Sequence, residues 1–199
     1  TMVLLTINHQ SLIGTKTNRI VRAAQGRPVM EFGSRRAQGP HGAINGARAA
    51  YIAGCSGTAC TISDIMYKTP ALGTMAHSWI QMFPTEYDAF LAYAKTYPEN
   101  CILLIDTYNV LKSGLPNAIK VFKEYLIPNG YTKGGVRIDS GDITYLTKKV
   151  RKAWIKPCGR AGPKNRIVGF AVGNDPLGSF RIGRKGFINI NPLAALKGK

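Results

Sequence analysis

Five consecutive apolar residues, 101–105, are the feature of this sequence that most restricts its fold. A strand with one solvent-facing side alternates apolar and polar residues, whereas a strand that is covered on both sides is apolar throughout. Such strands are typical of parallel sheets, in which a crossover helix connects each strand to the next. The run therefore predicts a buried parallel strand, which ends at Asp106.

Two other segments repeat the order of a strand followed by a helix. Residues 71–75 are a short apolar strand candidate before one helix, and residues 134–139 are another before a helix over residues 143–150. The central run is followed by a helix that begins at Pro116, where a missing N–H is harmless. Three such units at a spacing of roughly 30 residues predict a parallel α/β architecture. The periodicity does not distinguish a barrel from an open sheet.

Shorter signals place three more helix features. Thr85 followed by Asp88 is the pattern of a capped helix N-terminus. Residues 43–52 are rich in Ala and Gly, which predicts a helix that packs closely against a neighbour, and residues 57–66 predict a second short helix.

Polar residues follow each of the three predicted strands. They are His77-Ser78, Asp106-Thr107 and residues 137–142. Ligands of parallel α/β folds bind at the carboxyl ends of the strands, so these polar residues predict a ligand site there. Ordinary strand-end capping and turn chemistry would select the same residue types, and from the sequence alone both interpretations stay open.

The net charge of +17 is concentrated near the end of the chain. Residues 148–199 carry 13 Lys and Arg and a single acid, Asp175, so this segment alone accounts for +12. A basic segment of this kind can bind a polyanion such as nucleic acid. It has few interleaved aromatic residues and no nucleic-acid-binding motif, which argues against nucleic acid as the partner.

Cysteine and histidine spacing gives no sign of a metal site. The four cysteines include no Cys-x-x-Cys pair, and the three histidines are scattered along the chain. Reduced, mostly buried thiols are the simplest interpretation. No apolar run approaches the ~20 residues of a membrane helix, and no signal peptide is recognisable. The expectation is a soluble, cytoplasmic protein with no membrane partner.

Five groups of residues, in a common order and at similar spacing, resemble the nicotinate phosphoribosyltransferase family. They are Asn8-His9-Gln10-Ser11 with Lys16 and Arg19, residues 31–40 (EFGSRRAQGP), residues 73–79 (GTMAHSW), residues 106–108 (DTY) with 112–114 (KSG), and residues 137–142 (RIDSGD). The resemblance covers residues 4 to about 152. It implies a partial phosphoribosyltransferase domain over residues 1–152, which is part of the irregular α/β barrel of the type II fold. It leaves residues 153–199 as a basic tail of uncertain structure.

The resemblance also implies a reaction. Members of the family join nicotinate and phosphoribosyl pyrophosphate to give nicotinate mononucleotide and pyrophosphate, a salvage step of NAD synthesis. The reaction is coupled to ATP hydrolysis and uses Mg²⁺. The resemblance implies a homodimer, because the active sites of family members are completed across the subunit interface.

Three residues are expected, by this resemblance, to contact the nicotinate ring and the phosphates. Phe32 would stack on the planar ring. Arg35 and Arg137 would line the nicotinate and phosphate region, since a guanidinium fork suits carboxylates and phosphates. Without the resemblance, Phe32 would more often be a core aromatic residue and Arg35 part of a solvated basic pair. Gly33 and Gly39 favour a tight, exposed loop here.

His77, Asp139, Ser140 and Gly141 complete the expected site, and no metal ligand is identified. His77 matches the family's histidine that accepts the phosphoryl group of ATP, although a lone histidine after a strand is more often structural. Asp139 matches the position that hydrogen-bonds the ribose hydroxyls. Ser140 and Gly141 open a predicted helix whose free N–H groups favour anions. Ser140 or Asp142 could equally be an N-cap.

Ala59 bears on the choice of substrate. The related nicotinamide enzymes place an aspartate in the matching segment, where it receives the amide N–H. A carboxylate would repel the acid substrate, so Ala59 favours nicotinate over nicotinamide.

The resemblance ends near Lys152, and family members are longer at both ends. Residues 153–199 are either a divergent but genuine domain or a segment that is read out of frame. The abrupt basic shift and the codons for Trp154, Ile155 and Lys156 suggest the second account. A barrel that lacks strands has open edges. The alternative function is therefore an inactive fragment whose basic tail binds polyanions.

Overall fold

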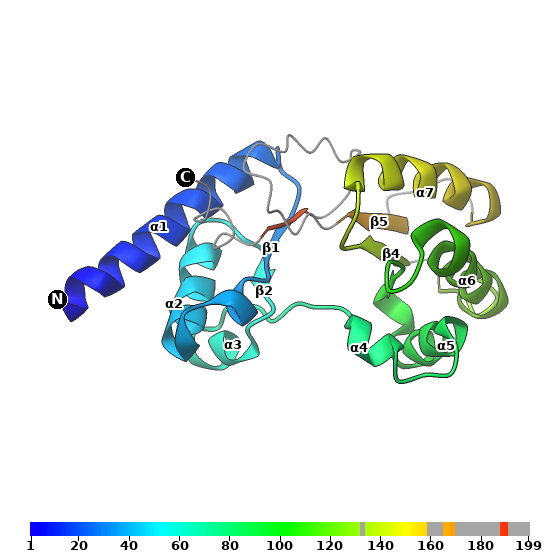
Figure 1. Ribbon diagram of the computed structural model, residues 1–199, viewed down its shortest axis with the longest axis horizontal. Coiled ribbons are helices and arrows are strands. Elements are labelled where there is room, and N and C mark those ends of the chain that lie inside the picture. Colours follow the sequence, from blue (N-terminus) through cyan, green and yellow to red (C-terminus); the bar gives the residue numbers. More distant parts are fainter. Residues whose placement is uncertain (132–133, 159–164, 170–187, 191–199) are drawn as a thin grey trace. The chain divides into compact units, whose positions relative to one another are not determined.

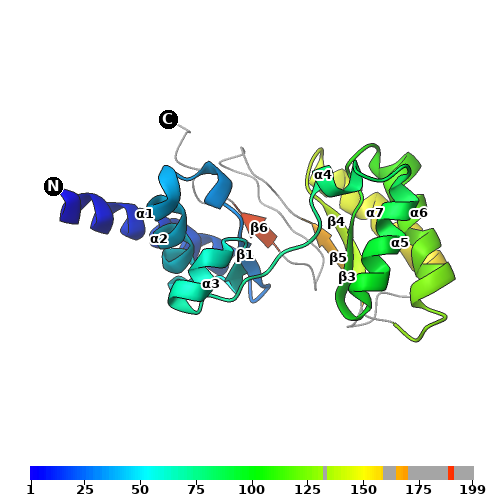
Figure 2. The same cartoon turned by 90° about the horizontal axis from the view of Figure 1, so that it is seen from below.

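The computed structural model describes residues 1–131, 134–158, 165–169 and 188–190, with side-chain environments as far as Trp154 (Figure 1, and Figure 2 from below). Most of the predicted basic tail lies outside the described residues. The segments of the tail that are described form the end of one helix and two short strands.

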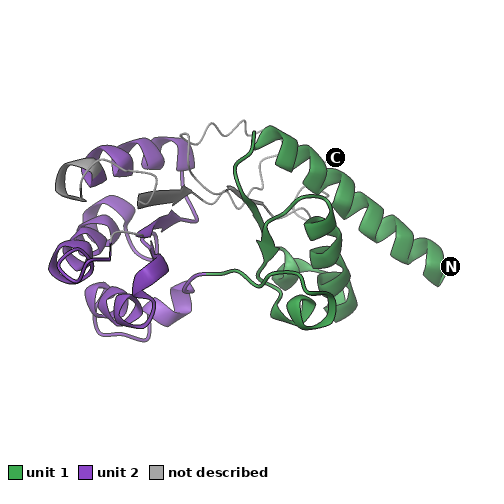
Figure 3. Cartoon of the chain, turned by 180° about the vertical axis from the view of Figure 1, so that it is seen from behind, with its two compact units in different colours: residues 1–73, 171–179, 187–199 green, residues 74–170, 180–186 purple. Residues whose placement is uncertain are grey.

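The chain forms two compact units (Figure 3). The first is built around Thr1–Gly73, and the second around Thr74–Phe170. The site residues predicted from the sequence are divided between them. Phe32 and Arg35 belong to the first unit, whereas His77 and the residues of the 137–142 segment belong to the second.

The first unit contains a small parallel sheet with helices. Its strand order is β2-β1-β6, and both pairings are parallel. A 3₁₀ turn, Ser34–Arg36, follows β1 directly. The helices and strands are α1 (Met2–Ala23), β1 (Val29–Glu31), α2 (Gly39–Ile52), β2 (Gly57–Thr58), α3 (Thr61–Tyr67) and β6 (Ile188–Ile190).

Small residues let α1 and α2 approach closely, as the Ala and Gly content of residues 43–52 predicted. Ala47 and Ala50 are buried in α2. A Cβ on Gly46 would lie 3.0 Å from Ile13 Cδ1 of α1, closer than most such contacts. The predicted helix is confirmed, and it begins four residues earlier, at Gly39.

Helix α1 was not expected from the sequence, and two other expectations need correction. The helix expected over residues 57–66 begins only at Thr61, because Gly57 and Thr58 pair with β1 as a strand. The strand expected over residues 71–75 is reduced to one bridge between Ala71 and Thr58, since the chain then crosses into the second unit without a ladder partner among the described residues.

The second unit alternates strands and helices. Its three strands lie in the order β3-β4-β5, and all pairings are parallel. Figure 2 shows α5, α6 and α7 on the same side of this sheet. The helices and strands are α4 (His77–Ile80), α5 (Glu86–Thr96), β3 (Cys101–Leu104), α6 (Leu115–Val121), β4 (Gly134–Ile138), α7 (Ile143–Cys158) and β5 (Asn165–Gly169).

The apolar run at 101–105 and the strand at 134–139 are confirmed as β3 and β4, so the parallel α/β prediction is correct for this unit. The capping pair is also confirmed, because the Asp88 N–H donates to Thr85 Oγ1 at 3.1 Å. The helix predicted from Pro116 begins earlier, in a π-type turn, Val110–Gly114. Asn109 caps that turn by accepting two backbone N–H groups, a signal the sequence analysis missed.

Large apolar side chains fill the core of the second unit. Trp154 is fully buried and meets the Phe122 ring edge-on, with 4.7 Å between the centroids. Helix α7 therefore continues the core beyond Lys152, although Trp154 Nε1 has no hydrogen-bond partner among the described residues. Gly114 packs so tightly against Ile105, the residue after β3, that a Cβ at position 114 would overlap the Ile105 carbonyl oxygen.

Two features of composition have structural counterparts. Cys55, Cys60 and Cys101 are free and buried, as the sequence predicted. Burial raises the pKa of the Cys55 and Cys101 thiols to about 12.

Within the part of the chain that the structure describes, no helix is both long and apolar enough to cross a bilayer.

Candidate functional site

Three segments that follow strands or connections of the second unit meet in one polar cluster. His77 is the first residue of α4, and its Nδ1 lies 3.0 Å from Thr107 Oγ1. Its Nε2 lies 3.9 Å from Asp106 Oδ1 and 3.7 Å from Asp139 Oδ2. The predicted polar residues therefore converge, although His77 follows a connection and only the other two groups follow strands.

Asp106 is the anchor of this cluster. Its Oδ2 accepts hydrogen bonds from the Asp139 N–H at 2.9 Å and from the Ser140 hydroxyl at 2.7 Å. Because β3 and β4 are neighbouring parallel strands, the residues just beyond them lie side by side, and one carboxylate can bridge both. Its side chain is only 1% exposed, so these bonds are shielded from water. Asp106 thereby holds the start of the 139–142 segment in place.

Arg137 supplies the positive charge of the cluster. Its Nη2 lies 2.9 Å from Asp139 Oδ2, and its Nη1 donates to Thr74 Oγ1 at 2.6 Å. The Arg137 side chain is 9% exposed and the Asp139 side chain 14%, so the pair is largely desolvated. A buried carboxylate paired and hydrogen-bonded in this way stays in one orientation.

The His77 side chain is much more exposed to solvent than the charged side chains around it. The His77 side chain is 41% exposed, whereas both carboxylates and the arginine are mostly covered. A solvent-facing imidazole can therefore meet a ligand while buried charges fix the surroundings of its ring. Such an arrangement is suited to phosphoryl or proton transfer at the imidazole.

The residues after Asp139 have separate functions. Ser140 bonds to Asp106, whereas Asp142 Oδ1 accepts the Tyr145 N–H at 2.9 Å. Asp142 is therefore an N-cap of α7, one of the two interpretations left open by the sequence. Gly141 has φ of +80°, a left-handed conformation that glycine adopts without strain, and it is exposed between them.

In the first unit, Glu31 has the same anchoring function for a different loop. This buried carboxylate accepts the Gly33 N–H with one oxygen and the Thr58 hydroxyl, at 2.6 Å, with the other. Thr58 Oγ1 in turn accepts the Cys60 N–H at 2.9 Å. Burial raises the pKa of Glu31, and the hydrogen bonds from Thr58 and Gly33 oppose that shift.

Phe32 and Arg35 lie on the loop that Glu31 anchors. Phe32 is half-buried, whereas Arg35 is exposed on the 3₁₀ turn, in agreement with the predicted tight loop. Gly39 ends the loop with φ of +79°. Ala59 belongs to the same neighbourhood, because its N–H donates to the Glu31 carbonyl oxygen at 2.9 Å.

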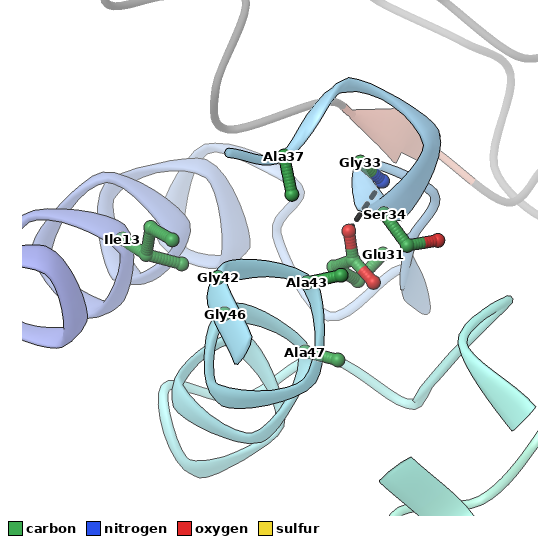
Figure 4. Close-up of a pocket in the computed structure, with 9 residues that line it drawn as sticks. All are labelled: Ile13, Glu31, Gly33, Ser34, Ala37, Gly42, Ala43, Gly46 and Ala47. Carbon is green, nitrogen blue, oxygen red and sulfur yellow. Dashed lines mark hydrogen bonds between the residues drawn. The ribbon is translucent and has the colours of Figure 1, made fainter. Parts of the chain in front are cut away.

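A small pocket opens beside the Glu31 carboxylate (Figure 4). Small residues of α2 and of the anchored loop form its walls, and Ile13 of α1 closes one side. The residues that line it are Ile13, Glu31, Gly33, Ser34, Ala37, Gly42, Ala43, Gly46 and Ala47.

The structure brings His77, Arg137, Asp139 and Ser140 into one cluster, and it places Phe32 and Arg35 on one loop of the other unit. Sequence reasoning missed the anchoring functions of Glu31 and Asp106 and the contact of Thr107 with His77. Glu31 stands directly beside Phe32, whereas Asp106 and Thr107 belong to the motif at residues 106–108, to which no site residue had been assigned. Among the described residues, no group of three or more His, Cys, Asp or Glu is arranged to hold a metal ion.

Comparison with known proteins identifies clear relatives, although no protein-family model matches the chain. The nicotinate phosphoribosyltransferase of Bacillus subtilis is 43% identical over 152 residues, which cover 76% of this chain and 30% of that protein. A nicotinate phosphoribosyltransferase of Mycobacterium tuberculosis is 38% identical over 191 residues, which cover 92% of this chain and 40% of the relative. The chain thus spans well under half the length of these relatives.

The fold comparison agrees. The crystal structure of human nicotinic acid phosphoribosyltransferase superposes with a TM-score of 0.75 at 24% identity, over 92% of this chain and 47% of that one.

A match over 92% of the chain extends past Lys152. In the structure, β5 also pairs in register with β4. Both observations favour a divergent but genuine domain over a segment read out of frame, and sequencing the coding DNA tests that hypothesis directly.

Proposed function

We propose that this chain, which belongs to the nicotinate phosphoribosyltransferase family over the part that aligns with its curated relatives, forms part of a nicotinate-salvaging enzyme. The enzyme would join nicotinate and phosphoribosyl pyrophosphate to give nicotinate mononucleotide and pyrophosphate, with coupled hydrolysis of ATP. The observation that carries the proposal is the cluster that His77 forms with Asp106, Arg137 and Asp139, which lie at or beside the carboxyl ends of β3 and β4.

His77 is the proposed acceptor of the ATP γ-phosphoryl group. Because the His77 side chain is exposed, a ring nitrogen can attack the γ-phosphorus while the bond from that phosphorus to the departing ADP oxygen breaks. The neighbouring carboxylates restrict the ring to one orientation. They also repel a bound phosphoryl group, which keeps the phosphoramidate labile and ready to break down as the reaction proceeds.

Asp139 and the residues after it are the proposed site for the ribose and its phosphate. Arg137 occupies Asp139 Oδ2, whereas Oδ1 has no hydrogen-bond partner among the described residues and keeps its acceptor capacity for ribose hydroxyls. The exposed backbone at Ser140 and Gly141 leads into α7, where N–H groups favour a phosphate oxygen.

Phe32 and Arg35 are the proposed contacts of nicotinate. The half-buried Phe32 ring is suited to stacking on the electron-poor pyridine ring, and the exposed Arg35 guanidinium can pair with its carboxylate. Ala59, whose N–H donates to the Glu31 carbonyl oxygen, lies near this loop. Its methyl side chain carries no negative charge that would repel the carboxylate of nicotinate.

Mg²⁺ does not fit a protein-built site here. Among the described residues, no His, Cys, Asp or Glu side chains are grouped so that they could hold a metal ion. Magnesium commonly binds through substrate phosphates and water. The Mg²⁺ implied by the resemblance would therefore be bound by the phosphates of phosphoribosyl pyrophosphate or ATP.

We further propose that the complete protein is a cytoplasmic homodimer that contains the full α/β barrel. The helices on one side of the β3-β4-β5 sheet match a barrel wall. The first turns of α1 expose Met2, Val3 and Leu4, an apolar surface that an assembled protein would cover.

A product assay tests the proposed function. The purified 199-residue chain is mixed with nicotinate, phosphoribosyl pyrophosphate, Mg²⁺ and ATP, and nicotinate mononucleotide is measured. His77→Ala should reduce ATP-dependent product to background, whereas His41→Ala, an exposed histidine of α2, should not. Equal product from both variants would contradict the assignment of His77.

The alternative is an inactive fragment that binds polyanions through residues 148–199, and the charge of +12 in that segment is the observation that favours it. No product from the folded chain, together with DNA binding that weakens steeply with salt, would support it. Salt-independent or absent DNA binding would exclude it.

A further inference from the structure

Glu31 is bonded to the segments that follow two neighbouring strands of the first unit. One of its carboxylate oxygens accepts the Gly33 N–H, on the loop that carries Phe32 and Arg35. The other oxygen lies 2.6 Å from the hydroxyl oxygen of Thr58, the last residue of β2. Because β1 and β2 are parallel and Glu31 pairs with Thr58, the segments after both strands begin at the same edge of the sheet.

Thr58 extends this connection into the turn after β2. Its Oγ1 accepts the Cys60 N–H at 2.9 Å, and Ala59 lies inside the same turn, with its N–H bonded to the Glu31 carbonyl oxygen at 2.9 Å. The backbone N–H groups of Gly33 and Cys60, at the two ends of the network, can only donate. The network therefore joins the two segments whether the proton between Glu31 and Thr58 is on the hydroxyl or on the carboxyl group.

On the side of α2, the loop held by Glu31 borders a pocket in place of closely packed side chains. Gly33, Ser34 and Ala37 form the loop wall of this pocket, and Gly and Ala residues of α2 form the facing wall (Figure 4). A pocket wall lacks the dispersion contacts that a closely packed neighbour would supply. Glu31 is 5% exposed and Thr58 is fully buried, so water does not compete for their bonds. These hydrogen bonds therefore fix the loop where side-chain packing does not.

We propose that Glu31 and Thr58 are positioning residues that clamp the loop at residues 32–35 to the turn at residues 58–60 and thereby set the affinity for nicotinate. The inference rests on the proposed function, which assigns the loop to nicotinate and places Ala59 near it. A stacking ring and a pairing guanidinium bind one ligand together only when the loop holds both in place. A preorganised loop avoids the ordering cost that a mobile loop pays on binding.

Substitutions at Thr58 test the clamp without a change of charge. Thr58→Val replaces the hydroxyl with a methyl group of similar size, and Thr58→Ser keeps the hydroxyl. Thr69→Val is the matched control, because it removes the hydroxyl of a buried threonine of the same unit whose Oγ1 has no hydrogen-bond partner in the described structure. If Thr58→Val does not fold, Thr58→Ala removes the same hydroxyl with less bulk.

Hydrogen exchange of the Gly33 amide is measured first, by NMR, and it needs no ligand. In Thr58→Val the Glu31 carboxylate loses one of its two side-chain bonds, so the Gly33 N–H at its other oxygen should open more often and exchange about fivefold faster. Thr58→Ser and Thr69→Val should exchange at the wild-type rate, and unchanged exchange of the α2 amides reports an intact unit. A Gly33 rate that is the same in Thr58→Val overturns the proposal.

Nicotinate affinity is measured second, by isothermal titration calorimetry. The dissociation constant should rise about tenfold in Thr58→Val and recover in Thr58→Ser. Phosphohistidine formation from ATP at His77, which belongs to the second unit, should keep the wild-type rate, and an equal fall in both would overturn the assignment. If Gly33 exchange rises but nicotinate binds to no variant, including the wild type, the proposed function fails and the clamp stands. If the wild type and Thr58→Val bind nicotinate equally, the assignment of the clamp fails and the proposed function stands.

Discussion

Glu31 of the first unit and Asp106 of the second are buried carboxylates with the same bonding pattern and different surroundings. Each accepts one backbone N–H and one side-chain hydroxyl, and each thereby fixes a loop near the end of a parallel strand. Asp106 lies among His77, Arg137 and Asp139, whereas Glu31 borders a pocket walled by Gly and Ala residues. A buried carboxylate thus supports a charged cluster in the second unit and a pocket wall of small residues in the first.

The packing around the two anchors differs in the same way. The second unit has a core of large side chains, including Trp154, Phe90 and Phe122. The first unit relies on the close approach of helices over small residues such as Gly46 and Ala47. The first unit therefore packs its helices through small residues, and the second unit packs mainly through large side chains.

Matched glycine substitutions should produce the largest difference between the units. In Gly114→Ala the new Cβ meets the Ile105 carbonyl oxygen, a backbone atom that cannot move aside, so we expect a loss of about 3 kcal/mol of unfolding free energy. In Gly46→Ala the nearest atom is the end of the Ile13 side chain, which can rotate, and we expect a loss below about 1 kcal/mol. Urea unfolding of both variants measures the difference. Equal losses would show that the kind of atom nearest to each new Cβ does not decide the cost.

Removal of the second-unit anchor should have the next largest effect. Asp106→Ala leaves the Asp139 N–H and the Ser140 hydroxyl without their acceptor, which costs about 2 kcal/mol of unfolding free energy. Loss of the loop position should also abolish ATP-dependent product if the chain is active. Asp64→Ala, a partly exposed aspartate of the first unit, is the control. An Asp106 variant as stable as that control would show that the anchor is dispensable.

The smallest expected effect is a pH dependence at Glu31. The folded-state pKa of Glu31 is raised above its ordinary value of 4.5. The protonated Glu31 therefore contributes its full stabilisation below pH 4.5, and this stabilisation is lost as the pH rises through the folded-state pKa. The stability of the wild type relative to Glu31→Gln, which does not titrate, should therefore fall as the pH increases from 4.5. Urea unfolding of both proteins across this range measures it. Glu99→Gln, at an exposed position, is the control. If the stability of the wild type relative to Glu31→Gln instead rises with pH, the pKa of Glu31 is lowered and the prediction is wrong.

Several features followed from the amino-acid sequence without any structure. The continuous apolar run at 101–105 predicts a buried strand, and β3 is buried at every position except Ile102, which is half-buried. The Thr85 and Asp88 cap and the convergence of polar residues at the strand ends were also predictable. These features depend on local periodicity and on the geometry of parallel strands, both of which are written in neighbouring residues. The five motifs led to the family, which the relatives of Bacillus and Mycobacterium confirm.

The roles of Asp106, Glu31 and Thr107 depended on tertiary structure. Each makes its decisive bond to a residue 27 to 34 positions away in the chain, and no local pattern specifies that pairing. The failure of the 71–75 strand has the same origin, since a strand needs a partner as well as apolar residues. Propensity and periodicity select elements, whereas the partners of a hydrogen bond are selected only when distant segments pack against one another.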